Sequence, residues 1–298
     1  MSGHLDHCGH VAIIGRPNAG KSTLLNRILG QKISITSRKP QTTRHRILGI
    51  KTTERTQVIY VDTPGLHEGG RRVMNRLMNR AALEALAGVD AVLFMVEDLR
   101  WSEEEDYILS RLRGCRQPVV LAVNKVDRIR PRERLLPHLE MLAARYPFAE
   151  IVPVSARNGK NVDRLEAALT RLLPPGPPLY PEDQITDRSE RFLAAELVRE
   201  KLMRRLGQEL PYALTVEIER FSEEGALLRI DALIWVERPA QKAMVIGRQG
   251  QGLKEVGRQS RLEMERLFGR KVFLQLWVKV KEKWSDDERA LRSLGYVE

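Results

Sequence analysis

The first 175 residues alternate between short apolar runs and longer stretches with helical periodicity. Six apolar runs predict strands over residues 11–14, 46–53, 57–61, 90–96, 118–123 and 151–154. Between them, apolar residues at helical spacing predict helices over residues 23–30, 73–87, 103–113 and 162–172. Strands that alternate with helices indicate a doubly wound, mostly parallel α/β sheet, which binds ligands at the carboxyl ends of its strands.

The hydrophobic pattern changes after five prolines within residues 174–181. Because prolines cannot continue a helix and favour extended backbone, we predict a stiff linker over residues 176–185. This linker separates a first domain, residues 1–175, from a second, residues 186–298. The second domain's pattern predicts a helix (189–206), a hairpin (213–221 and 226–236), two helices (240–246 and 253–268) and a strand (272–280). This α-β-β-α-α-β order indicates an α+β domain.

A phosphate-binding loop follows the first predicted strand. Residues 15–22 fit G-x-x-x-x-G-K-[ST] between a strand and a helix, the context that this motif requires. Backbone N–H groups and the helix N-terminus would surround the phosphates of a nucleoside triphosphate. Lys21 would reach the β- and γ-phosphates, and Ser22 would bind Mg²⁺. The predicted phosphate-contacting residues are Gly15, Arg16, Pro17, Asn18, Ala19, Gly20, Lys21, Ser22 and Thr23.

A second motif, Asp62-Thr63-Pro64-Gly65, comes directly after a predicted strand. An acidic residue at this place is where a phosphate-loop enzyme positions its second Mg²⁺ anchor. The backbone N–H of Gly65 would meet the γ-phosphate, since glycine leaves the backbone free to move. The motif therefore predicts a segment that senses the γ-phosphate.

A third motif selects the base. Residues 124–127 fit N-K-x-D at the end of another apolar strand. The Asp127 carboxylate would accept hydrogen bonds from N1–H and N2–H₂ of guanine, and adenine offers neither donor. The stem of Lys125 would lie on the base plane while Asn124 braces neighbouring loops. A backbone N–H at Ser155 or Ala156 would meet guanine O6. The motif excludes an ATPase and indicates a GTP-binding protein.

The second domain carries a G-x-x-G loop, Gly247-Arg248-Gln249-Gly250, between two predicted helices. KH domains use such a loop to hold the backbone of single-stranded nucleic acid. The predicted RNA-binding residues are Lys242, Ile246, Gly247, Arg248, Gln249, Gly250, Lys254 and Arg258, with Lys279 and Lys281 extending the basic surface. A plain helix connection, and an edge strand protected by lysines, are the alternatives at these two places.

The composition indicates that the protein binds a polyanionic partner and resides in a reducing compartment. The chain of 298 residues has a formal net charge of +11, of which residues 1–175 supply +10. An RNA site in the second domain must therefore be a segregated basic face. Two cysteines give no disulfide framework, and no apolar run has the length of a membrane span, so we expect a cytoplasmic protein. Four His and Cys residues within residues 1–10 suggest a metal site or, with better support, a polar tail.

These motifs together resemble a known family. GRPNAGKST, QTTRHR, DTPGLH, NKVD and VSA, followed by VIGRQGQGLKEVG and LWVKVKEKW, are similar to the Era family, bacterial GTPases of the TrmE–Era-like superfamily with a C-terminal type II KH domain. The resemblance covers nearly the whole chain. It implies a monomeric GTP-hydrolysing switch that binds 16S rRNA near its 3′ end and assists assembly of the 30S subunit. It also implies peripheral attachment to the inner face of the cell membrane.

The resemblance also implies roles in hydrolysis. Lys21, Asn18, Thr43 and Gly65 would carry catalysis, and Ser22, Thr43 and Asp62 would hold Mg²⁺, with Thr42 as the alternative to Thr43. Leu66 occupies the place of the glutamine that orients water in Ras-like enzymes, so intrinsic hydrolysis should be slow. Related GTPases with this substitution use K⁺ beside an asparagine such as Asn18, and we carry that over as a hypothesis. His67 is either a base or a bystander.

Two functional classes stay open at this point. The first is an RNA-dependent assembly GTPase in which the nucleotide state alters domain docking and so controls RNA binding. The second is a GTP-regulated adaptor whose KH-like domain docks a protein or membrane partner. The basic residues around the G-x-x-G loop favour the first class.

Overall fold

The computed structural model describes residues 5–66, 73–207 and 210–293. The contacts between Cα atoms divide the chain into two compact structural units. The first comprises Met1–Ser34, Thr43–Gly70 and Met78–Asp187, and the second comprises Ile35–Thr42, Arg71–Leu77 and Arg188–Glu298. Two short segments of the N-terminal half, residues 35–42 and 71–77, thus group with the C-terminal half. Within the described ranges no helix is long and apolar enough to cross a bilayer.

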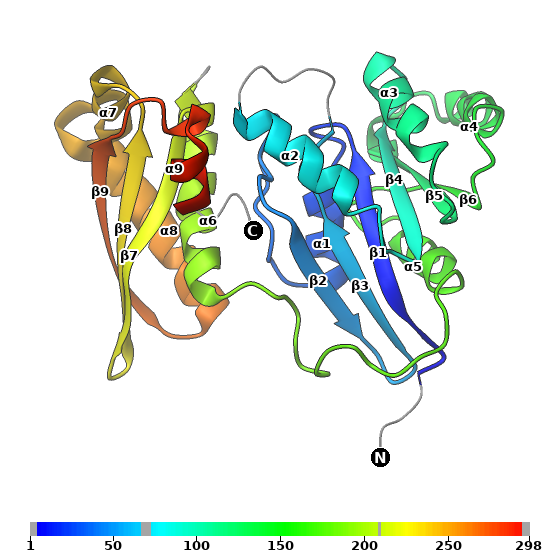
Figure 1. Ribbon diagram of the computed structural model, residues 1–298, viewed down its shortest axis with the longest axis horizontal. Helices are drawn as coiled ribbons and strands as arrows, with labels where there is room; N and C mark the ends of the chain where they lie inside the picture. Colours follow the sequence, from blue (N-terminus) through cyan, green and yellow to red (C-terminus); the bar gives the residue numbers. More distant parts are fainter. Residues whose placement is uncertain (1–4, 67–72, 208–209, 294–298) are drawn as a thin grey trace. The chain divides into compact units, whose positions relative to one another are not determined.

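The first unit is built on a six-stranded sheet of order β2-β3-β1-β4-β5-β6 (Figure 1). All neighbouring strands are parallel except β2 and β3. The strands are β1 (His7–Gly15), β2 (Ile47–Thr52), β3 (Thr56–Asp62), β4 (Ala91–Glu97), β5 (Val119–Asn124) and β6 (Glu150–Pro153). The helices are α1 (Lys21–Leu29), α3 (Glu103–Leu112), α4 (Leu135–Ala143) and α5 (Val162–Thr170), with α2 (Val73–Glu84) belonging to this unit from Met78 onward. The predicted doubly wound, mostly parallel sheet is confirmed.

Local sequence explains where these helices begin and end. Helix α1 ends at Gly30, whose φ of 67° is the left-handed conformation that glycine adopts at low cost. Ser102 and Glu105 form a capping box at the start of α3, because Glu105 accepts the Ser102 N–H at 2.8 Å. Helix α4 was not predicted, since Pro137 lies in it; proline is tolerated in a first helical turn, where N–H groups have no helical acceptor.

The second unit has a three-stranded sheet of order β7-β8-β9. The β7–β8 pair is antiparallel and the β8–β9 pair is parallel. Its elements are α6 (Glu190–Arg205), β7 (Leu214–Glu224), β8 (Leu227–Val236), α7 (Pro239–Ile246), α8 (Gln251–Phe268), β9 (Lys271–Val280) and α9 (Glu288–Ser293). Helices α6 and α8 pack on one face of the sheet around a core that includes Leu197, Ile230 and Val256. Apart from α9 the order is the predicted α-β-β-α-α-β, and the type II KH fold is confirmed.

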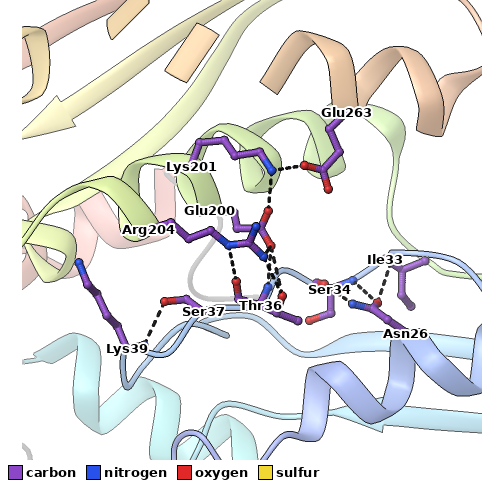
Figure 2. Close-up of polar contacts among 10 residues, drawn as sticks. All are labelled: Asn26, Ile33, Ser34, Thr36, Ser37, Lys39, Glu200, Lys201, Arg204 and Glu263. Carbon is purple, nitrogen blue, oxygen red and sulfur yellow. Dashed lines mark hydrogen bonds and ion pairs between the residues drawn. The ribbon is translucent and has the colours of Figure 1, made fainter. Parts of the chain in front are cut away.

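Helix α6 buries a charged cluster as well as its apolar side. Its buried charged residues are Glu196, Arg199, Glu200 and Lys201. Two of them, Arg199 and Glu200, contact the segment Ile35–Thr42 of the same unit, as Figure 2 shows for Glu200 and Thr36. The Thr36 N–H donates to Glu200 at 2.9 Å, and Arg204 Nε donates to the Thr36 carbonyl at 3.1 Å. An ion pair of Lys201 with Glu263 on α8 balances the remaining charge.

Candidate functional site

The phosphate loop connects β1 to α1 as predicted. Gly20 has a φ of 102°, and a Cβ there would lie 2.2 Å from Nδ2 of Asn124, so only glycine fits. Lys21 opens the helix and donates through Nζ to the carbonyls of Gly15 (3.0 Å) and Arg16 (3.1 Å). Burial lowers the pKa of Lys21 to about 8, partly opposed by the charge of Asp62. The ammonium group therefore lies within the loop that would hold the phosphates.

The three predicted Mg²⁺ ligands come together at the start of α1. Ser22 Oγ donates to Asp62 Oδ2 and lies at hydrogen-bond distance from Thr43 Oγ1, both at 2.8 Å. The Asp62 carboxylate is fully buried, and within the described part of the chain no group bonds to its Oδ1. Burial raises the pKa of Asp62, while the nearby charge of Lys21 lowers it. Oxygen ligands around a buried, incompletely paired carboxylate fit a hard divalent cation.

The structure also bears on which threonine belongs to this set. The Thr42 hydroxyl donates to the carbonyl of Lys39 at 2.7 Å, so it is occupied within its own turn. Thr43 is buried and faces Ser22. The geometry therefore favours Thr43 over Thr42.

Ser34 was missed by the sequence analysis. Its hydroxyl donates to Asp62 Oδ2 at 2.9 Å, beside the bond from Ser22. Asn26 of α1 holds this turn, because its side-chain oxygen accepts the N–H groups of Ile33 and Ser34, each at 3.0 Å (Figure 2). An isolated serine in a polar loop gives no signal of this contact, since it depends on the turn that Asn26 makes.

The Asp62–Gly65 segment approaches the phosphate loop closely. A Cβ on Gly65 would lie 2.7 Å from the backbone nitrogen of Pro17, so the approach requires glycine. The Thr63 hydroxyl is buried and donates to the Ile13 carbonyl at 2.9 Å, which gives it a structural partner. Leu66 is fully buried in the apolar core. His67, the alternative base, lies outside the described residues.

The base-selecting motif lies where β5 ends. The Asn124 amide donates to the Ala19 carbonyl at 2.8 Å, and its oxygen accepts the Ala156 N–H at 2.9 Å. Lys125 Nζ donates to the Asn18 carbonyl at 2.9 Å. Asn124 and Lys125 thus join the phosphate loop to the loops that would surround guanine, which is the bracing predicted for Asn124.

The backbone N–H groups of Ser155 and Ala156, one of which was predicted to meet guanine O6, have partners within the protein. The Ala156 N–H donates to Asn124, and the Ser155 N–H donates to the Lys160 carbonyl at 3.1 Å. The contact of one of these N–H groups with guanine O6 stays a prediction. The Ser155 hydroxyl instead donates to Asp127 Oδ1 at 2.6 Å, which orients the carboxylate.

The G-x-x-G loop connects α7 and α8 in the second unit. Gly247 and Gly250 have φ values of 73° and 78°, and no atom lies within 4 Å of a Cβ added at Gly250. The backbone there is open. Lys242, Arg248, Gln249 and Lys254 are exposed around it, whereas Ile246 packs partly into the core. Arg258 is exposed but is ion-paired with Glu255 at 2.8 Å, which offsets its charge. The predicted basic surface is thus gathered at one end of α8.

Lys279 and Lys281 lie on a different face. The side chains of β9 that alternate with theirs, such as Val278, point into the core beneath the helices. Both lysines lie over the ring of Trp235, at 6.0 and 5.6 Å from its centre. They are therefore on the sheet face opposite the helices, so they do not continue the basic surface at the G-x-x-G loop.

Two family models match the chain over these two folds. Residues 10–125 match a family described as 50S ribosome-binding GTPase, and residues 209–285 match the KH domain. A phosphate loop, an Asp62 anchor and an N-K-x-D motif on one sheet edge, joined to a KH domain, define the class as a phosphate-loop GTPase with a KH domain.

Full-length relatives narrow the class further. GTPase Era of Glaesserella parasuis is 58% identical over 299 residues, covering 100% of both chains, and that of Pseudomonas aeruginosa is 60% identical over 289 residues, covering 97% of this chain and 95% of that one. The chain belongs to the Era GTPase family.

Two solved structures of Era are similar to this chain over nearly its whole length. One, in complex with MgGDPNP and nucleotides 1506–1542 of 16S ribosomal RNA, is 40% identical with a TM-score of 0.95, covering 98% of this chain and 99% of that one. A variant of Aquifex aeolicus Era bound to GDP and AlF₄⁻ is also 40% identical, with a TM-score of 0.94 and coverage of 98% and 100%.

Proposed function

We propose that this protein is a Mg²⁺-dependent GTPase that binds 16S rRNA near its 3′ end and assists assembly of the small ribosomal subunit. One observation supports the whole proposal: the solved Era that matches 98% of this chain was bound to MgGDPNP and to nucleotides 1506–1542 of 16S ribosomal RNA. The G-x-x-G loop and the nucleotide motifs of this chain supply residues suited to both ligands.

The first unit supplies the nucleotide chemistry in this proposal. Ser22, Thr43 and Asp62 would hold Mg²⁺, which when bound offsets the charge on the phosphate oxygens. Lys21 and the loop N–H groups from Gly15 to Thr23 bind the phosphates. Asn124, Lys125 and Asp127 hold guanine, with Asp127 oriented by Ser155. The segment Asp62–Gly65 senses the γ-phosphate because Gly65 lies against the loop at Pro17.

Intrinsic GTP hydrolysis by the protein alone is expected to be slow. The side chain after Gly65 is Leu66, which is buried and has no proton to exchange with water. Asn18 is exposed on the phosphate loop with a φ of 67°, which places it where a monovalent cation would replace an arginine finger. K⁺ is therefore the activator that we propose.

Replacing Na⁺ by K⁺ at equal ionic strength should accelerate GTP turnover by roughly tenfold or more, since a fixed cation stabilises transition-state charge. Asn18→Ala should remove the difference between the two salts while it leaves GDP binding largely intact. Phosphate release measured in KCl and NaCl tests both statements. Equal rates in the two salts would exclude the cation from the mechanism.

The RNA proposal predicts a selective loss in a variant of the G-x-x-G loop. Arg248→Asp with Gln249→Asp places negative charges where phosphates would pass, so RNA affinity should fall by roughly tenfold or more. Both positions are exposed, so stability should change within about ±0.5 kcal/mol per site. Fluorescence anisotropy with a 16S 3′-end oligonucleotide, beside GTPase assays on the same preparation, measures both effects.

Arg266→Asp is the matched control, because it reverses an exposed charge in the last turn of the same helix. It should retain most of the RNA affinity. If the double variant bound RNA as tightly as the parent, the RNA site would have to be sought elsewhere, first at Lys279 and Lys281. The G-x-x-G loop would then be a plain connection between helices.

A second candidate function has one observation in its favour. On the sheet face opposite the helices, Phe273 and Trp277 are 44% and 38% exposed, which is unusual for large aromatic side chains. This face would suit the alternative adaptor role, in which the KH-like domain docks a protein or membrane partner. RNA affinity that does not change between low and high salt would favour the adaptor, since phosphate binding must weaken with salt.

Location and assembly state belong to the proposal as well. Cys8 and Cys115 are both free thiols, which suits the cytoplasm. Peripheral attachment to the inner face of the cell membrane is to be tested by sedimentation with anionic vesicles. The monomeric state is to be tested by analytical ultracentrifugation of the full chain.

A further inference from the structure

Strand β4 occupies a special position in the first sheet. It lies between β1, which leads into the phosphate loop, and β5, which leads into the N-K-x-D motif. All three strands are parallel, so they end at the same edge. The last residue of β4 is Glu97, which is paired in register with Asn124. A long side chain at this position can reach both nucleotide-binding loops.

The two carboxylate oxygens of Glu97 are used by different loops. Oε1 accepts a hydrogen bond from Arg16 of the phosphate loop, and Oε2 forms an ion pair with Nζ of Lys125. Lys125 also donates to the Asn18 carbonyl. Arg16 forms a second ion pair, Nε to Glu105 Oε1 at 2.7 Å, with a residue of the capping box of α3. One carboxylate thus joins the two loops.

The ion pairs of this cluster are buried. Glu97 is 8% exposed and Glu105 is 1% exposed, so both carboxylates are largely removed from water. Two acids and two bases balance the charge of the cluster, and a buried charge-assisted pair restricts geometry more than an exposed pair. These ion pairs therefore fix the distance between the two loops in addition to stabilising the fold.

We infer that Glu97 is a positioning residue for nucleotide binding. Its carboxylate holds Arg16 and Lys125 at a fixed separation, so the phosphate loop and the guanine-binding loop are preorganised for one nucleotide. Its ion-pair partners, Arg16 and Lys125, are not among the residues proposed for hydrolysis, so Glu97 is expected to act on affinity and not on the chemical step. The inference rests on the proposed guanine-nucleotide binding.

The test is Glu97→Gln in the full-length protein. The neutral amide keeps the shape but loses the charge, so GDP affinity should fall about tenfold, mainly through faster dissociation, and KM for GTP should rise by a similar factor. The value of kcat should stay within about twofold, the signature of lost uniform binding. Glu97→Asp, which is one methylene shorter and can retain one of the two cations, should fall between parent and Glu97→Gln.

Glu166→Gln is the matched control, because it removes a partly buried carboxylate that pairs with Lys51 in the same unit. It should leave GDP affinity unchanged even where it lowers thermal stability. A double-mutant cycle then separates positioning from folding: Glu97→Gln should add little to the loss of GDP affinity caused by Lys125→Met, since both break the same contact.

Three outcomes would overturn the inference. They are unchanged GDP affinity in a folded Glu97→Gln variant, an equal loss of affinity in Glu166→Gln, and full additivity with Lys125→Met. If Glu97→Gln does not fold, Glu97→Asp decides by the same criteria. If the parent protein itself fails to bind GDP, the proposed function fails first, and that result is distinguishable because it needs no variant.

Discussion

Lys21→Ala is expected to abolish measurable GTP turnover while the nucleotide-free protein keeps nearly the same thermal unfolding. Its ammonium group is buried inside the phosphate loop, where it donates to the carbonyls of Gly15 and Arg16. A fixed cation in this position opposes charge on the β- and γ-phosphates, and losing one such group costs roughly 10²- to 10³-fold or more in rate. Burial of the charge is itself unfavourable, so its removal should cost the fold little.

The pH dependence of GDP affinity provides the control for this variant. Phosphates bind the charged form of Lys21, whose pKa in the free protein burial lowers to about 8. GDP affinity of the parent should therefore fall as the pH rises through 8, because the lysine must then take up a proton on binding. Lys21→Ala should lose part of this dependence and keep the part that belongs to Lys125, whose pKa burial also lowers to about 8. A large loss of stability in Lys21→Ala without nucleotide would identify a structural lysine instead.

Asp127→Asn is expected to change the base that the protein prefers. The Asp127 carboxylate is oriented by the Ser155 hydroxyl at 2.6 Å, so it is set to accept two hydrogen bonds from guanine. Replacing it with an amide loses charge-assisted bonds worth about 2–4 kcal/mol, which weakens GTP by roughly 30- to 1000-fold. Xanthine nucleotides should bind more tightly, because their 2-oxo group accepts a hydrogen bond from the new amide.

Competition of GDP and XDP against one fluorescent nucleotide, for parent and variant, measures this change of preference. The binding-site fold should be unaffected, since asparagine has the shape of aspartate and can still accept from Ser155. Parent-like affinity of Asp127→Asn for GDP would mean that another residue reads the base.

The motifs were predictable because each of them follows a buried strand. Apolar runs predict the strands, and parallel strands end at one edge of the sheet, so the sequence predicts that Gly15, Asp62 and Asn124 converge. Their hydrogen bonds agree with that expectation. The strand pattern cannot predict the acceptor of each backbone N–H: those of Ser155 and Ala156 donate to Lys160 and Asn124, a pairing that no local pattern indicates.

Long-range pairing explains the remaining differences. The polar residues of α6 predict a face exposed to solvent. Arg199 and Glu200 are nevertheless buried against residues 36–42 of the same unit. Their partners lie more than 150 residues away in the sequence, and no local pattern indicates such a contact. The same reason applies to Glu97, whose partners at residues 16 and 125 become neighbours only through the strand order.

Strand β1 differs from expectation at its start. Residues 1–10 were expected to form a polar tail or a metal site, but β1 begins at His7 and pairs with β3 from Thr56 onward. His7 Nδ1 bonds to the Leu173 carbonyl at 2.8 Å, and Cys8 is buried. Among the described residues no group of three or more His, Cys, Asp or Glu side chains is arranged to hold a metal ion. His7 and His10 are part of a strand.

The central proposal, a GTPase that binds the 3′ end of 16S rRNA, is tested most directly by one titration. The intact protein is titrated with an oligonucleotide spanning nucleotides 1506–1542 of 16S rRNA, the segment bound by the solved Era, in the presence of GDP or a non-hydrolysable GTP analogue. We expect saturable binding that weakens with salt and is tighter with the GTP analogue than with GDP. Binding no tighter than to a scrambled oligonucleotide, in both nucleotide states, would contradict it.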